Sequence, residues 1–243
     1  MGESKLWVEG LSKNFGRKMA VRDVSFSMNN GEIVGLLGPN GAGKTTVFYM
    51  IVGFIRANRG KILLNQKEIT HQPMYIRARE GISYLPQDAS VFRKLTVEKN
   101  IWAILDTRKD LTKAEKKEKL ELLIQDLGIE HVRHQMAFTL SGGERRRTEI
   151  ARSLAIEPRF LLLDEPFAGI DPIAVYEIKK IVQRLSGQGI GVLITDHNVR
   201  DTLEITHRSY IINLGEIVVD GTKSELLANQ TARTVYLGHE FEM

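Results

Sequence analysis

A glycine-rich segment, GPNGAGKTT, begins at Gly38 directly after the apolar run EIVGLL. From Gly38 to Thr45 the spacing is that of a phosphate-binding loop, provided that a strand precedes it and a helix follows. The glycines allow backbone N–H groups to surround a polyphosphate, and the following helix presents its positive end to the same anion. In such a loop Lys44 contacts the β and γ phosphates, and the hydroxyl of Thr45 binds a magnesium ion. The segment therefore predicts a nucleoside triphosphate site formed by Gly38, Pro39, Asn40, Gly41, Ala42, Gly43, Lys44, Thr45 and Thr46.

Two acidic residues, Asp164 and Glu165, follow the apolar run FLLL. This pattern predicts a buried strand that delivers both carboxylates to its carboxyl end, where open parallel sheets bind their ligands. Two adjacent acids would repel each other there unless a cation or a proton offset their charge. We expect Asp164 to join the magnesium shell and Glu165 to be the general base that activates the attacking water.

A third motif, LSGGE, ends at Glu144. Ser141 and Glu144 have the spacing of a capping box, which by itself predicts only the start of a helix. Gly142 and Gly143 inside the box would also let a phosphate approach this helix terminus closely, which would make a second anion site. The fragment alone leaves both interpretations open. A chain with a glycine loop and a separate anion-binding helix end can complete a site by pairing with a copy of itself.

Hydrophobic periodicity predicts the elements that must position these motifs. The expected strands span residues 5–15, 20–28, 31–38, 159–166 and 190–197, and a hairpin spans 208–221. The expected helices span residues 44–56, 171–189 and 222–230. The second of these has a clear start, because Asp171 can cap it and Pro172 suits its first position. Together these elements predict an α/β fold whose N-terminal part is rich in strands.

Residues 88–158 differ from the rest of the chain, because Lys and Glu are dense there and apolar residues recur at helical spacing. Thr112 and Glu115 have the spacing of a capping box that begins an amphipathic helix. Glu115 is four residues from Lys119, which permits an ion pair on that helix. We expect this segment to be an α-helical subdomain inserted in the core, with its charges on a solvated face.

Length and composition limit the classes of protein that the chain can represent. With 243 residues, 42% of them hydrophobic, we expect one domain over residues 1–243 that ends in a helix and tail over residues 223–243. The absence of cysteine excludes disulfides and thiolate metal sites. No apolar run is long enough to span a membrane, and the N-terminus lacks the pattern of an export signal. The net charge of +4, with 34 basic and 30 acidic residues interspersed, argues against a dedicated nucleic-acid binder.

In this order and spacing, GPNGAGKTT, LSGGE and LLLDEP resemble the nucleotide-binding subunits of ABC transporters. The resemblance implies a P-loop NTPase fold with a RecA-like core, an N-terminal antiparallel β subdomain and an inserted α-helical subdomain. The ligands that it implies are ATP and Mg²⁺. It also implies a head-to-tail homodimer that holds two ATP molecules between its copies. Each ATP would lie between the loop at Gly38 of one copy and Ser141, Gly142, Gly143 and Glu144 of the other.

Further positions match motifs of this family one by one. Gln87 in YLPQ matches the glutamine that senses magnesium and faces the membrane partner, and His197 in ITDH matches the histidine that contacts the γ-phosphate. Asp171 in AGID matches the aspartate at the dimer contact. Phe15 matches the aromatic that stacks on adenine, where relatives more often carry Tyr; a plain half-buried aromatic is the alternative. The resemblance thus implies catalytic roles for Glu165, His197, Lys44 and Gln87, and metal binding by Thr45, Gln87 and Asp164.

Across nearly the whole length, segments such as YLPQDASVFRKLTV and VYLGHEF are similar to the ATPases of lipopolysaccharide export systems. This resemblance implies a cytoplasmic homodimer, peripheral on the inner membrane beneath two membrane-spanning subunits, that powers the extraction of lipopolysaccharide. The end of the chain, GHEFEM, departs from the commoner acidic form. One alternative is the ATPase of a branched-chain amino-acid importer, which would keep every catalytic residue. Another is a soluble ABC ATPase acting on ribosomes or DNA, which usually has a second such domain or a long coiled coil.

Phe92, Arg93 and Lys94 follow Gln87 closely and offer an aromatic with basic neighbours, suited to gripping a helix of a membrane partner. The alternative is that Phe92 lies in the core where the helical subdomain begins. The basic run at residues 145–147 could attract lipid headgroups, but we expect a solvated helix face with local ion pairs.

Overall fold

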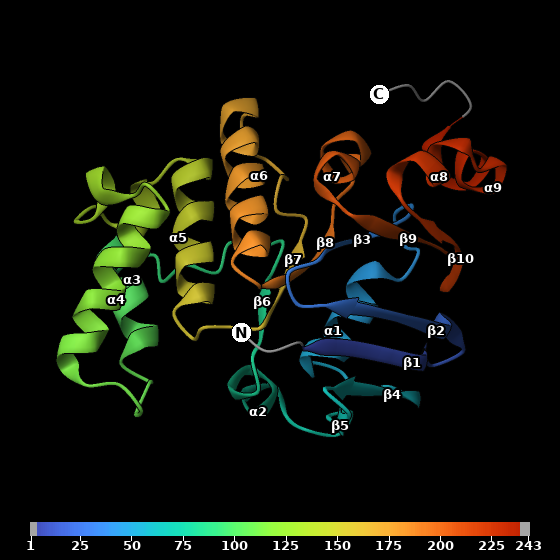
Figure 1. Cartoon of the computed structure of the whole chain (residues 1–243), viewed down its shortest axis with the longest axis horizontal. Coiled ribbons are helices and arrows are strands. Elements are labelled where there is room, and N and C mark those ends of the chain that lie inside the picture. The colour runs from blue at the N-terminus through green and yellow to red at the C-terminus, as the bar shows by residue number, and fades with distance from the viewer. Residues whose placement is uncertain (1–3, 239–243) are drawn as a thin grey trace.

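The structure is a computed structural model that describes residues 4–238. It contains two β-sheets with helices packed against them and a group of helices set to one side (Figure 1). The strands are β1 (Lys5–Phe15), β2 (Lys18–Asn29), β3 (Ile33–Leu37), β4 (Arg59–Leu64), β5 (Lys67–Glu68), β6 (Ile82–Leu85), β7 (Phe160–Asp164), β8 (Gly191–Thr195), β9 (Arg208–Asn213) and β10 (Glu216–Gly221). The α-helices are α1 (Lys44–Val52), α2 (Met74–Arg79), α3 (Val97–Leu105), α4 (Lys113–Asp126), α5 (Gly142–Leu154), α6 (Pro172–Gly187), α7 (Val199–Ile205), α8 (Lys223–Ala228) and α9 (Gln230–Ala232), and the shorter turns are η1 (Glu130–Val132), η2 (Ala137–Thr139) and η3 (Arg233–Leu237).

The six-stranded sheet has the order β10-β9-β3-β8-β7-β6 and is parallel from β9 to β6. Every residue of β3, β7 and β8 is buried. Helices α6 and α7 cover one face of this sheet, and α1 with the second sheet covers the other (Figure 1). Because strands buried on both faces need apolar side chains throughout, they form continuous apolar runs. The predicted α/β fold and its buried strands are confirmed.

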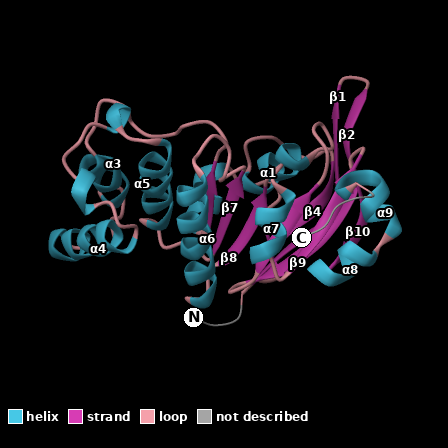
Figure 2. Cartoon of the chain, turned by 90° about the horizontal axis from the view of Figure 1, so that it is seen from above, coloured by secondary structure: helices cyan, strands magenta, loops and turns pink. Residues whose placement is uncertain are grey.

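The four-stranded sheet has the order β2-β1-β4-β5 and is antiparallel throughout. Its buried side packs against α1 in an apolar cluster that includes Val8, Met28 and Phe48. β1 and β2 extend as a long hairpin beyond the rest of the sheet (Figure 2). The predicted antiparallel N-terminal region is therefore confirmed, and Phe15 lies at the tip of its hairpin.

Helices α3, α4 and α5 form the group beside the sheets (Figure 1). The predicted capping box at the start of α4 is present, since the Thr112 hydroxyl and the Glu115 carboxylate each accept a hydrogen bond from the other's backbone N–H. Because that box holds Glu115, Lys119 forms its ion pair with Glu157 instead, and the predicted pair along α4 is wrong.

The helix after the glycine loop is shorter than predicted. It ends at Val52, because Gly53 adopts a left-handed conformation with φ of 86° and its N–H bonds to the Tyr49 carbonyl. Phe54 therefore leaves the helix, where it is 56% exposed and packs edge-on against Tyr49.

The predicted C-terminal helix and tail contain more than one helical element within residues 223–237. After α8, the segment that has no clear period forms α9 and the π-helical turn η3, which ends at Leu237. The last five residues, HEFEM, lie outside the described residues. Among residues 4–238, no helix combines the length and the apolar character needed to cross a membrane.

Candidate active site

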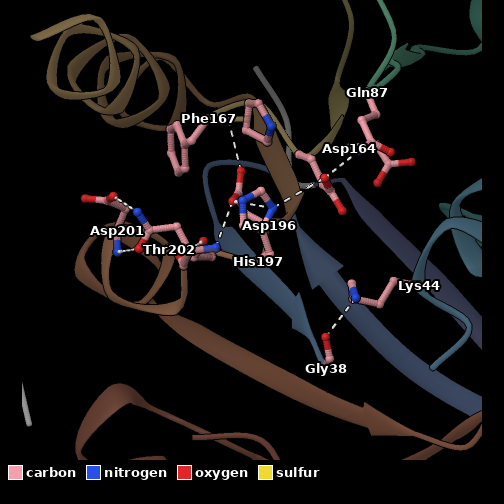
Figure 3. A network of polar contacts seen from close by, with 12 residues as sticks. Gly38, Lys44, Gln87, Asp164, Phe167, Asp196, His197, Asp201 and Thr202 are labelled. Carbon is pink, nitrogen blue, oxygen red and sulfur yellow. Dashed lines mark hydrogen bonds and ion pairs between the residues drawn. The ribbon is translucent and has the colours of Figure 1, made fainter. Parts of the chain in front are cut away.

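The glycine-rich loop connects β3 to α1, as its motif requires. Gly43 caps the helix with φ of 110°, and a Cβ atom there would lie only 2.7 Å from the Ala20 carbonyl oxygen, so only glycine fits. Lys44 begins the helix and folds back over the loop. Its ammonium donates to the carbonyl of Gly38 at 2.7 Å (Figure 3). It also donates to the carbonyl of Pro39 at 3.1 Å.

Asp164 and Glu165 lie at the carboxyl end of β7. Asp164 is 1% exposed; its Oδ2 accepts a hydrogen bond from the Tyr84 hydroxyl at 3.1 Å, and its buried Oδ1 has no hydrogen-bond partner among the described residues. Glu165 has φ of 47°, a left-handed conformation that is strained for a residue with a side chain. Its N–H donates to the Thr195 carbonyl at the end of β8, which extends the pairing of the two strands into the site.

The electrostatics of this carboxylate pair fit a bound cation. Burial raises the pKa of Asp164 and the charge of Glu165 adds to the rise, while the hydrogen bond from Tyr84 opposes it. Burial also lowers the pKa of Lys44, the nearby cation. An unpartnered, buried carboxylate oxygen is the kind of ligand that Mg²⁺ prefers, and Mg²⁺ usually completes its shell with water and substrate phosphates. Among residues 4–238, no three histidine, aspartate or glutamate side chains are grouped so that they could hold a metal ion by themselves.

Two polar side chains contact the predicted general base. Gln87 Nε2 donates to Glu165 Oε2 at 2.6 Å, and His197 Nδ1 lies 3.4 Å from the same oxygen. Gln87 follows β6 and His197 follows β8, so they come from the strands on either side of β7 (Figure 3). Three positions that are far apart in the sequence therefore meet at one carboxylate oxygen.

The predicted residues surround an open cavity of about 720 Å³ at the carboxyl ends of these strands. Its lining residues are Phe15, Lys18, Ala20, Asn40, Gly41, Gly43, Lys44, Thr45, Thr46, Gln87, Glu165 and His197. Phe15 is 51% exposed, so a face of its ring is accessible to a ligand in the cavity. Lys18 and Ala20 of β2 are lining residues that we did not predict. The predicted loop residues Gly38, Pro39 and Ala42 and the predicted metal ligand Asp164 are not among the lining residues.

The remaining predicted residues, Ser141, Gly142, Gly143, Glu144 and Asp171, do not line this cavity. Ser141 and Glu144 form the predicted capping box at the start of α5, and Asp171 caps α6 by accepting from the Ala174 N–H at 3.0 Å. A Cβ atom on Gly143 would lie 2.7 Å from the Cβ of Ala174. The second glycine is therefore required for the packing of α5 on α6, a reason that differs from the predicted approach of a phosphate.

Arg146 of α5 is a functional residue that the sequence analysis missed. It is 6% exposed, and its guanidinium donates to the carbonyls of Pro86 (2.9 Å), Glu165 (2.8 Å) and Pro166 (3.1 Å). It also forms an ion pair with the buried Glu149, and burial lowers the pKa of Arg146. The predicted solvated basic face is wrong at this position. No local pattern could have revealed it, because three of its partners are main-chain atoms of distant loops.

Asp196, which precedes His197, is a second residue that was missed. It is completely buried and accepts hydrogen bonds from the N–H groups of Phe167 and Asn198 (Figure 3). Its own carbonyl accepts from the Tyr236 hydroxyl at 3.3 Å. The available signal was an acidic residue at the end of a buried apolar strand.

Phe92 is 45% exposed, so the alternative that placed it in the core is wrong. The guanidinium of Arg152, on α5, lies 4.5 Å from the centre of its ring and donates to the Ser90 carbonyl at 2.5 Å. The Ser90 N–H in turn donates to Glu149, also on α5. The loop that follows Gln87 is therefore fastened to the helix that begins with the LSGGE motif.

The model of the ABC transporter family matches residues 21–168. The chain is 52% identical over 240 residues to the lipopolysaccharide export system ATP-binding protein LptB of Haemophilus influenzae. The aligned region covers 99% of this chain and 100% of that protein. The chain is also 50% identical over 238 residues to LptB of Escherichia coli strain K12, with 98% and 99% covered. A crystal structure of an ATP-binding cassette of an ABC transporter in its ADP conformation is similar with a TM-score of 0.86 and 27% identity, with 97% and 99% covered.

Proposed function

The chain belongs to the ABC transporter family, and we propose that it is the ATP-hydrolysing subunit of a transporter that extracts lipopolysaccharide from the inner membrane for export. The cargo is inferred from two relatives that are named for this export system and match about half of the residues over nearly the whole chain. The observation that carries the proposal is the cavity in which Lys44, Gln87, Glu165 and His197 meet.

In this proposal, Phe15 stacks on the adenine while the backbone of residues 38–46 surrounds the phosphates. Lys44 exchanges its two carbonyl partners for β- and γ-phosphate oxygens. Thr45 and Asp164, with Gln87, hold Mg²⁺, which when bound neutralises charge on the phosphates. The unpartnered Oδ1 of Asp164 supports its assignment.

Glu165 accepts a proton from the attacking water. The water oxygen bonds to the γ-phosphorus while the bond from that phosphorus to the ADP oxygen breaks, so ADP is the leaving group and inorganic phosphate is formed. Gln87 and His197 both contact Glu165 Oε2, so they orient its carboxylate. Both side chains therefore lie beside the place that the attacking water and the γ-phosphate take in this proposal. The left-handed backbone of Glu165 directs this side chain into the cavity and is held by Arg146 through the Glu165 carbonyl.

We infer that the site is completed by a second copy of the chain. The helix terminus at residues 141–144 does not line the chain's own cavity, and the N–H groups at the start of a helix can bind an anion. In a head-to-tail homodimer, this terminus and Asp171 contact the ATP bound to the other copy. ATP then holds the copies together through hydrogen bonds from both, and hydrolysis releases them by removing the γ-phosphate.

The exposed ring of Phe92, with Arg93 and Lys94, is the proposed docking surface for a membrane-spanning subunit. Each copy of the chain in the homodimer binds a helix of one of the two membrane-spanning subunits through this surface. Two features support this role. The loop that carries Phe92 also contains Gln87, and Arg152 fastens this loop to α5. Movement of the LSGGE helix on ATP binding would thereby reach the membrane subunits, with the chain on the cytoplasmic face of the inner membrane.

Affinity purification from detergent-solubilised inner membrane tests this proposal. We expect two membrane-spanning subunits of lipopolysaccharide export to co-purify with the full chain, and Phe92→Ala to lose them while it keeps ATP binding. Trp7→Ala, which removes an equally exposed aromatic from β1, is the matched control and should retain both subunits. Co-purification with amino-acid importer subunits, or tight nucleic-acid binding with a steep salt dependence, would refute the proposed cargo.

A further inference from the structure

The carboxylate of Asp196 joins two separate loops of the site. Its Oδ2 accepts the N–H of Phe167 at 3.0 Å, and its Oδ1 accepts the N–H of Asn198 at 2.9 Å (Figure 3). Nδ1 of His197 lies 3.6 Å from the same Oδ1. Across residues 4–238, Asp196 forms no ion pair with a lysine or arginine, although none of its surface is exposed.

A buried carboxylate of this kind costs free energy unless its hydrogen bonds compensate for lost hydration. Filling a space would not require an acid here, because an apolar side chain would do so without that cost. The N–H groups of Phe167 and Asn198 do require an acid, because each of them donates to a different oxygen of one carboxylate. The side chain thereby ties Phe167 to a loop that is 29 residues away in the sequence.

We infer that Asp196 is a positioning residue that couples the contact of His197 with the γ-phosphate to the loop that presents Asp171 to the second copy. The inference rests on the proposed roles of His197 and Asp171. His197 is bonded to Asp196 along the chain, and Phe167 begins the segment that leads to Asp171 at the start of α6. When the γ-phosphate leaves, a shift at His197 moves the Asp196 carboxylate, which carries the Phe167 backbone with it.

Asp196→Asn in the full chain tests this inference, because the amide keeps the size but can accept only one of the two hydrogen bonds. We expect kcat for ATP hydrolysis to fall about tenfold while KM for ATP changes less than about threefold, since the interaction matters after ATP has bound. Asp201→Asn is the matched control. Asp201 contacts Lys179 and Asn198 but not Phe167, so its kcat should stay within about twofold of wild type.

A second measurement separates coupling from a purely structural role. In the Glu165→Gln background at saturating Mg-ATP, Asp196→Asn should raise about tenfold the protein concentration that gives half-maximal dimerisation. Added to His197→Ala, it should cause no further change, because Asp196 acts through His197.

Equal kcat for Asp196→Asn and Asp201→Asn would overturn the inference, as would an effect of Asp196→Asn that adds in full to that of His197→Ala. A wild-type chain that bound ATP but never dimerised would instead refute the proposed function, and the coupling with it. Dimerisation of wild type together with an unaffected Asp196→Asn variant would refute the coupling alone.

Discussion

Replacing Arg146 with Met should destabilise the chain far more than the same replacement of its neighbour Arg147. Met approximates the volume of the buried side chain but donates no hydrogen bond, so three loop carbonyls lose a donor and the buried Glu149 loses its cation. Breaking one side of a buried ion pair costs about 3–5 kcal/mol, and we expect a loss of that size in the free energy of unfolding. Arg147 pairs with the half-exposed Glu177, so its loss should cost about 0–1 kcal/mol.

Urea denaturation followed by circular dichroism measures both variants under the same conditions. The rate of ATP hydrolysis provides a second readout, because Arg146 holds the carbonyl of Glu165 while Arg147 does not. Arg146→Met should therefore hydrolyse ATP more slowly even at temperatures where it is folded. A free energy of unfolding within about 1 kcal/mol of the Arg147→Met value would refute the role of Arg146 in holding the loops together.

Three further changes have defined outcomes. Glu165→Gln should keep ATP binding and ATP-dependent dimerisation while lowering kcat about 10²–10⁴-fold, the usual contribution of a general base; brisk hydrolysis would rule out that role. Gly143→Ala should cost about 1–3 kcal/mol because its Cβ meets Ala174 at 2.7 Å, and adding Ala174→Gly should restore the melting temperature unless the packing of α5 on α6 is looser than described. Burial raises the pKa of Tyr236 to about 12, so its contribution to stability is complete below pH 10 and is lost as the pH rises towards 12. Tyr236→Phe should flatten that decline in urea midpoint, and an unchanged slope would show that the hydroxyl does not titrate there.

Most elements of the fold could be predicted because their signals are local. The buried strands β7 and β8 are continuous apolar runs, and the helix between them begins with an aspartate followed by proline. The end of α1 could not be predicted from apolar spacing, since the left-handed cap at Gly53 interrupts a pattern that continues to Ile55. The ion pair of Lys119 depends on Glu157, whose proximity only the tertiary structure determines.

The candidate site divides in the same way. Glu165 lies one residue after the end of β7 at Asp164, His197 follows β8 by two residues, and Lys44 ends the loop that follows β3. The carboxyl ends of these strands meet at one edge of the sheet, so sequence position places the three residues together. Arg146 and Asp196 act on main-chain atoms of other loops, up to 60 residues away for the carbonyl of Pro86. Main-chain partners leave no trace in residue types, so the role of Arg146 could not be inferred from the sequence. The position of Asp196 after the buried strand β8 marks it as a candidate site residue, but not which N–H groups it binds.

The central claim is that each ATP lies between the glycine loop of one copy and the LSGGE terminus of another. The chain has no cysteine, so a disulfide between introduced cysteines reports this contact without interference. Two variants in the Glu165→Gln background, Asn40→Cys and Ser141→Cys, are mixed as separate chains. We expect a covalent dimer under mild oxidation only when Mg-ATP is present. A disulfide requires Cα atoms within about 7 Å, so it forms only if the two positions meet across the dimer. Each variant alone should remain monomeric on a non-reducing gel. If the mixture also stays monomeric with Mg-ATP bound, the shared site does not exist.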